Sequence, residues 1–259
     1  EDPDLGLARG YFRGLTQAPL ARLEPTGKPI GNVLWIVIDA LRPDHLGLYG
    51  YPKPTSPFLD TWSKNAFIGL HHQVNAPWTR PSTASMLTGL FPSGHRTQTD
   101  ESRLPEGVTT IGQDLKRLGY QTAAVVGNGN GSSIAGLDRG FDHYVDTLTA
   151  WKGLPSAAEV YGKGLEWFDH HRAKDQKWFM FMFAVDPHDP YHAPPEYEKE
   201  WLPKGFAGEP RRRAHWEYKN QYPKGERDSM LAVYDASIRY TDDRTRELFA
   251  ALEKRGLLK

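Results

Sequence analysis

The sequence predicts an α/β fold in which a mostly parallel central sheet is flanked by helices on both faces. Three apolar runs, at residues 32–39, 121–126 and 178–185, have the pattern of strands that are buried on both faces. Helical segments alternate with these runs, which indicates parallel pairing with right-handed crossovers. With 259 residues, of which 39% are hydrophobic, the chain can bury the core of such a fold, although length alone would allow one domain or two.

Local signals predict each element in chain order. Residues 1–31, with prolines at positions 3, 19, 25 and 29, are interpreted as an N-terminal lead-in arm to a domain over residues 32–259. Ser56-Pro57 is a good helix start, so a helix is expected over residues 56–65. The further predictions are helices over residues 110–118, 157–172 and 227–255, strands over residues 121–126 and 178–185, and no regular structure over residues 193–226.

Polar residues follow each of the three predicted strands. Asp39 ends the first strand, Asn128 lies in the Gly-Asn-Gly-Asn-Gly run after the second, and His188 follows the third. The carboxyl ends of parallel strands meet at one edge, where open α/β sheets bind ligands. Each residue alone has a simpler reading: Asp39 as a cap, Asn128 in a flexible turn and His188 as a solvated loop residue. Their predicted convergence favours a site.

A second informative segment of the sequence begins at Thr79. In Thr79-Arg80-Pro81-Ser82-Thr83 the proline suits the first turn of a helix, and a run of small residues continues to Leu87-Thr88-Gly89. Thr79 is therefore expected at a helix N-terminus, where free backbone N–H groups attract a tetrahedral oxyanion. The alternative is that Thr79 only caps the helix.

At these segments the chain resembles the sulfatase branch of the alkaline phosphatase superfamily, from about Asn32 to the last residue. The resemblance matches Asp39 to a metal-binding aspartate and residues 79–83 with 87–89 to the nucleophile signature. It also matches His188 with Pro190-Tyr191 to the substrate-side His-x-Pro-Tyr, and residues 234–242 to a long helix.

The resemblance implies a metal-dependent hydrolase or transferase of phosphate or sulfate esters. One or two divalent ions (Zn, Mn, Mg or Ca) are expected, with Asp39 and Thr79 as metal ligands. Thr79 is expected to be the nucleophile and His188 the second catalytic residue. The candidate substrate-binding residues are Ser82, Arg42, Asn128 and His192. The resemblance also implies an anionic ester substrate and an extracytoplasmic location, either periplasmic or secreted.

Three departures from the family pattern bear on the chemistry. Thr79 stands where sulfatases carry a Cys or Ser that is oxidised to formylglycine, Thr83 stands in place of an arginine, and Ala40 in place of a second aspartate. Threonine nucleophiles in other branches of the superfamily attack phosphorus and form a covalent intermediate. The phosphoester is therefore favoured, and the alternative is a catalytically inactive sulfatase-like protein with a binding or regulatory role.

One part of the family pattern does not occur in the sequence. No apolar run ends in the Asp-His-Gly triplet that supplies the remaining metal ligands, because Asp142-His143 and Asp169-His170 lie in other contexts. The chain is therefore interpreted as the N-terminal portion of the domain, which lacks the C-terminal part. A C-terminal segment or second fragment is the expected partner.

Composition excludes several other classes of function. Lys+Arg and Asp+Glu each number 32, so the chain lacks the basic excess of a nucleic-acid-binding or anionic-membrane surface. The absence of cysteine excludes disulfides and thiolate metal sites. No apolar run approaches the length of a membrane span.

Overall fold

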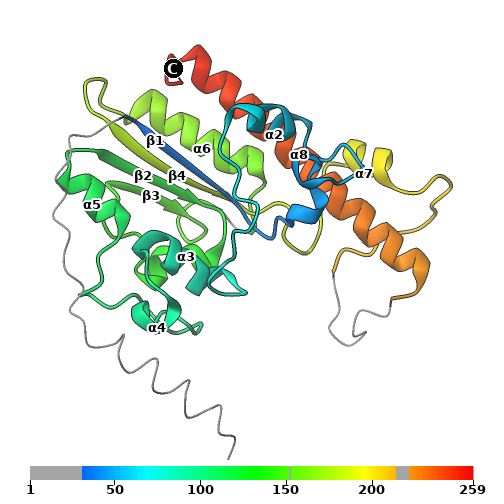
Figure 1. The fold of residues 1–259 in the computed structure, drawn as a ribbon, viewed down its shortest axis with the longest axis horizontal. Coiled ribbons are helices and arrows are strands. Elements are labelled where there is room, and N and C mark those ends of the chain that lie inside the picture. The colour runs from blue at the N-terminus through cyan, green and yellow to red at the C-terminus, as the bar shows by residue number, and fades with distance from the viewer. Residues whose placement is uncertain (1–30, 152, 214–221, 259) are drawn as a thin grey trace, which may run out of the picture.

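The computed structural model describes residues 31–151, 153–213 and 222–258, so nearly all of the predicted lead-in arm lies outside the described residues (Figure 1). The strands of the described residues form one four-stranded sheet of order β1-β4-β2-β3, and all its pairings are parallel. The strands are β1 (Val33–Ile38), β2 (Gln121–Val126), β3 (His143–Asp146) and β4 (Trp178–Ala184). This arrangement confirms the predicted α/β fold.

The strand register brings three loops to the same edge of the sheet. Ile38 at the end of β1 pairs with Ala184 at the end of β4, and Val126 at the end of β2 pairs with Phe183. The three strands therefore end almost level. The residues that follow them leave the sheet side by side.

Strand β4 divides the core into two faces because successive side chains of a strand point to opposite sides. Phe179, Phe181 and Phe183 pack in one cluster, whereas Met180 and Met182 pack in the other. All these residues are at most 2% exposed. Both faces are thus covered, as the uninterrupted apolar run predicts.

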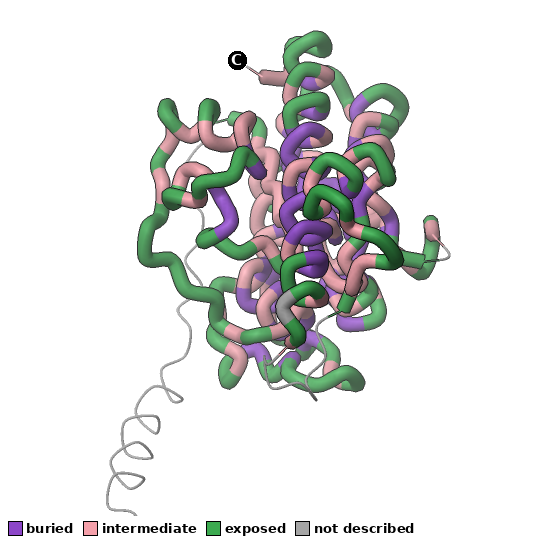
Figure 2. Tube along the Cα trace, turned by 90° about the vertical axis from the view of Figure 1, so that its right-hand side faces the viewer, coloured by how far each residue is buried: buried purple, intermediate pink, exposed green. Residues whose placement is uncertain are grey.

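Helices cover both faces (Figure 1). Helices α6 (Ala157–His170) and α8 (Lys224–Lys254) line the methionine face, and α3 (Thr79–Thr88) and α5 (Ile111–Arg117) lie on the phenylalanine face. Buried residues concentrate along the sides of these helices that face the interior (Figure 2). The other α-helices are α2 (Pro57–Trp62), α4 (Pro92–His95) and α7 (Pro195–Trp201). Short 3-10 turns span Pro43–His45, Gly47–Tyr49, Ser63–Asn65, Gly129–Gly131 and Ser133–Ala135.

Three elements were not predicted from the sequence, and the short helix α4 is one of them. Strand β3 is too short to give an apolar run and is defined by its pairing with β2. Helix α7 lies in the stretch predicted to be irregular, where Pro195 occupies the first turn and Tyr197 packs edge-on against Tyr240 of α8. Arg212, from the basic run that follows α7, forms two hydrogen bonds to Glu198 of this helix.

Candidate functional site

One amide group joins the two residues that were predicted to share a metal. The Nδ2 atom of Asn128 donates to Oδ2 of Asp39 at 2.5 Å and to Oγ1 of Thr79 at 3.3 Å. Asp39 follows β1, Asn128 follows β2 and Thr79 begins α3. Residues from positions 39, 79 and 128 of the chain therefore meet at the carboxyl edge of the sheet, as predicted.

The orientation of Asn128 is fixed from its other side. Its Oδ1 accepts a hydrogen bond from the backbone N–H of Asn130 at 2.9 Å, so Nδ2 must face Asp39 and Thr79. Burial raises the pKa of Asp39, and the hydrogen bond from Asn128 and the nearby His188 partly offset this rise. The carboxyl group is thus held in an enclosed, hydrogen-bonded setting.

A pocket of about 460 Å³ opens at these residues. Asp39, Thr79, Ser82 and His188 all line it. Thr79 is the first residue of α3, and its predecessor Trp78 has extended backbone angles, so the free N–H groups of the first helical turn lie at this end. The pocket therefore combines a hydroxyl group, a carboxyl group, an imidazole and a helix N-terminus.

His188 enters the pocket with one ring nitrogen already engaged. Its Nδ1 lies 2.5 Å from the backbone oxygen of Asp189. Because a carbonyl oxygen only accepts, Nδ1 carries the proton and Nε2 is the nitrogen left for other partners. This geometry suits a group that exchanges a proton with a bound molecule.

Of the four predicted substrate-binding residues only Ser82 lines this pocket, whereas Asn128, Arg42 and His192 do not and have other partners. The Arg42 guanidinium is exposed and forms two hydrogen bonds to Asp44. His192 is also exposed, and its Nδ1 lies 3.5 Å from Oε1 of Glu198. Asn130, which was not among the predicted residues, lines the pocket. The repeated asparagines of the Gly-Asn-Gly-Asn-Gly run are the sequence signal that could have indicated it.

The positions that depart from the family pattern also lie at the site. Ala40 and Thr83 both line the pocket. Thr83 is fully buried, and its hydroxyl has no hydrogen-bond partner among the described residues. No positive side chain thus stands at position 83, where the resemblance leads us to expect an arginine.

The Asp39 carboxylate and the Thr79 hydroxyl are suitable ligands for a divalent cation, but two side chains are too few to coordinate it fully. A carboxylate and a hydroxyl are oxygen ligands of the type that hard and borderline ions accept. Among residues 31–151, 153–213 and 222–258, no group of three or more His, Cys, Asp or Glu side chains is placed to hold an ion. Asp39 and Thr79 would therefore contact one side of an ion and leave its other positions to water or further residues.

Comparison with known proteins identifies the family. The model of the Sulfatase family matches residues 31–259. Steryl-sulfatase of Mus musculus is 30% identical over 158 residues, which cover 53% of this chain and 25% of that protein. The chain thus matches only part of the length of this relative.

Solved structures agree in fold. The phosphonate monoester hydrolase of Agrobacterium radiobacter has a TM-score of 0.68 at 17% identity, over 88% of this chain and 60% of that chain. An alkaline phosphatase superfamily protein from Vibrio parahaemolyticus has a TM-score of 0.60 at 20% identity, over 88% of this chain and 51% of that chain. In the part of the chain that the structure describes, no helix has both the length and the apolar character needed to cross a membrane. The family match over residues 31–259 shows that the chain belongs to the sulfatase family.

Proposed function

We propose that this chain contributes the nucleophile of a metal-dependent hydrolase or transferase of phosphate or sulfate esters, with phosphoesters preferred. The observation that carries the proposal is the contact of one Asn128 nitrogen with both the Asp39 carboxylate and the Thr79 hydroxyl. In this arrangement the hydroxyl is oriented, lies at a helix N-terminus and faces a pocket. A hydroxyl in this position can attack an anion held at the helix N-terminus once a bound ion activates it.

In the reaction, the Thr79 hydroxyl releases its proton to water, and its Oγ1 atom forms a bond to the phosphorus or sulfur atom while the bond to the leaving oxygen breaks. The N–H groups of the first turn of α3 stabilise the negative charge that develops on the non-bridging oxygens. His188 gives a proton from Nε2 to the departing alcohol. Water or an acceptor alcohol then attacks the Thr79 ester and passes its proton back to Nε2, and the Thr79 oxygen leaves as the regenerated hydroxyl group. A divalent ion bound beside Asp39 and Thr79 would supply positive charge that favours the ionised hydroxyl.

The preference for phosphorus rests on Thr79 itself. A threonine cannot be converted to the formylglycine on which sulfate-ester chemistry depends in the family. The fold relative from Agrobacterium radiobacter is a phosphonate monoester hydrolase, so phosphorus chemistry occurs on this fold. The substrate class is therefore an anionic phosphoester. We also propose an extracytoplasmic location for the protein.

Substitution of Thr79 tests the proposal. In the complete protein we expect Thr79→Val to lower the turnover of p-nitrophenyl phosphate, phosphonate and phosphodiester substrates by at least about a thousandfold. Thr79→Ser should keep a large part of it because the hydroxyl remains. Thr88→Val, at the other end of α3, is the matched control and should leave turnover unchanged. A Thr79→Val protein with full turnover would show that another group is the nucleophile.

A binding or regulatory role is the second candidate, and two observations favour it. Position 83 carries a hydroxyl with no hydrogen-bond partner among the described residues rather than a cation, and position 40 carries no carboxylate. Under this alternative, the complete protein with Zn, Mn, Mg or Ca would bind phosphate or vanadate in a calorimeter but turn over none of the esters.

A further inference from the structure

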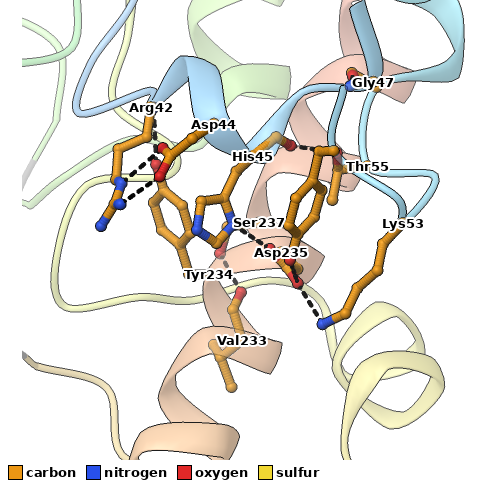
Figure 3. A network of polar contacts seen from close by, with 12 residues as sticks. Arg42, Asp44, His45, Gly47, Lys53, Thr55, Val233, Tyr234, Asp235 and Ser237 are labelled. Carbon is orange, nitrogen blue, oxygen red and sulfur yellow. Dashed lines mark hydrogen bonds and ion pairs between the residues drawn. The ribbon is translucent and has the colours of Figure 1, made fainter. Parts of the chain in front are cut away.

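The hydroxyl of Tyr234, in helix α8, closes the turn that follows Asp39. It donates to the backbone oxygen of Ala40 at 2.8 Å and accepts from the backbone N–H of Arg42 at 2.9 Å. Figure 3 shows the Tyr234 ring against the loop that carries Arg42, Asp44 and His45. One side chain thus binds both ends of a three-residue turn that lies 194 positions away in the sequence.

The turn that Tyr234 binds is conformationally unusual. Ala40 has φ of 53°, in the left-handed region that non-glycine residues rarely adopt. Its neighbour Asp39 is still held by the sheet, because its N–H donates to the oxygen of Ala184 at 3.0 Å. The chain therefore changes direction at Ala40, directly after the residue that carries the carboxyl group of the site.

Tyr234 is itself held firmly. The residue is 4% exposed, and its ring makes T-shaped contacts with the rings of His45 and Tyr191 at centroid distances of 5.0 and 5.3 Å. His45 is fixed in turn by a 2.6 Å contact between its Nδ1 and Oδ1 of the buried Asp235. The hydroxyl is thus a rigid point from which the turn at Ala40 can be held.

We propose that Tyr234 is a positioning residue: its hydroxyl keeps Ala40 left-handed and thereby directs the Asp39 carboxylate at Asn128 and Thr79. The structural part of this proposal is independent of the reaction. Its effect on turnover rests on the function proposed above. Ala40 replaces an aspartate of the family pattern, so the turn keeps its shape here without a side chain that tolerates the left-handed region well.

The test uses the side-chain amide signals of Asn128 in NMR spectra, which report its hydrogen bond to Asp39. In Tyr234→Phe the ring contacts remain and only the hydroxyl is lost, so the fold should persist while the Asn128 signals shift. Adding Ala40→Gly makes the left-handed turn easy without the hydroxyl. The double variant should therefore return the Asn128 signals toward their original positions. Ala40→Val, which disfavours the turn without touching α8, should shift them as Tyr234→Phe does.

Turnover provides the second measurement in the complete protein. Tyr234→Phe should lower kcat by roughly ten- to a hundredfold with a smaller change in KM, because a displaced carboxylate affects the reaction more than binding. The double variant with Ala40→Gly should recover most of kcat. Tyr120→Phe is the matched control, since Tyr120 is also 4% exposed and its hydroxyl donates to the Gly31 oxygen, away from the site. It should leave kcat and the Asn128 signals unchanged.

The results separate this proposal from the proposed function. If Tyr234→Phe leaves the Asn128 signals and kcat as they are in the original protein, or if Ala40→Gly restores neither, the positioning role is wrong. If the Asn128 signals move and are restored as expected but no variant, including the original protein, turns over an ester, the positioning role stands and the proposed function fails.

Discussion

His188 has a single ring nitrogen available for chemistry, because its Nδ1 is bound to the Asp189 oxygen. We expect His188→Ala to lower kcat by about a hundredfold or more for esters of ordinary alcohols, which leave only when protonated. The loss should be much smaller for p-nitrophenyl esters, since p-nitrophenolate leaves without a proton. Thermal unfolding should change little because the side chain is partly exposed. Equal losses with both leaving groups would contradict the role of proton donor.

The locations of some site residues could be predicted from the sequence, whereas the contacts of other residues could not. Asp39, Asn128 and His188 could be placed because each directly follows a strand, and strand ends define the edge of a sheet. The pairing of Arg42 with Asp44 is local, whereas the contact of His192 with Glu198 joins a loop to helix α7, which was not predicted. The Tyr234 hydroxyl reaches Ala40 across 194 positions, a contact that periodicity within one helix cannot indicate.

Among the elements, α5 depends on a close approach of the chain at Gly140. This glycine has φ of 89°, and a Cβ added there would overlap the backbone of Gly112 and Gln113 in α5. We expect Gly140→Ala to destabilise the protein by more than about 3 kcal/mol, from backbone strain together with overpacking. Gly119→Ala is the control, because Gly119 has a similar φ of 83° but open space around it. The Gly119→Ala substitution should lower the free energy of unfolding by only about 1–2 kcal/mol. Similar losses in urea unfolding would show that the approach to α5 is unimportant.

The contact between α2 and α8 should make stability depend on pH. Asp242 of α8 accepts hydrogen bonds from the N–H groups of Phe58 and Leu59 in the first turn of α2. Burial raises its pKa from 3.8 to about 6. The folded state thus holds this proton more tightly than the unfolded state, so the stabilisation is complete below pH 3.8 and is lost as pH rises through about 6.

Asp242→Asn should remove this dependence. In the original protein, the titration of Asp242 should lower the free energy of unfolding by roughly 2 kcal/mol between pH 4 and pH 6. In Asp242→Asn this loss should disappear, so the free energy of unfolding should fall less steeply with pH. Asp228→Asn, at an exposed position of the same helix, should leave the slope unchanged. Denaturant unfolding at several pH values measures both. An Asp242→Asn protein with the original slope would mean that another group titrates in this window.

The elements themselves were largely predictable because their signals are local. The alternation of phenylalanine and methionine in β4 and the capping boxes of α5 and α6 lie within a few residues of the chain. Strand β3 was not predicted, since four residues without an apolar run become a strand only by pairing with β2. Helix α7 was missed because its acidic first turn lay in a stretch rich in charge and proline.

At the scale of the whole molecule, the small number of metal-binding side chains predicts that residues 1–259 alone bind a divalent ion weakly. Asp39 and Thr79 supply one carboxylate and one hydroxyl, at most three oxygen atoms, whereas divalent ions take roughly four to eight ligands. We therefore expect residues 1–259 alone to bind a divalent ion weakly and to lack turnover, and a second segment or fragment to restore both. Calorimetric titration with Zn and Mn and an ester assay would test this. An isolated chain with full turnover would contradict it.

The sheet order also determines how firmly each part of the site is held. Among the described strands, β4 and β2 have partners on both sides, whereas β1 pairs only with β4 and all six of its residues are partly exposed. The amides of β1 should therefore exchange with deuterium sooner than those of β4, through local opening well below the free energy of global unfolding. Asp39 follows this less protected strand, while Asn128 and His188 follow protected ones. Local opening of β1 would thus dismantle the site while the rest of the fold stays intact.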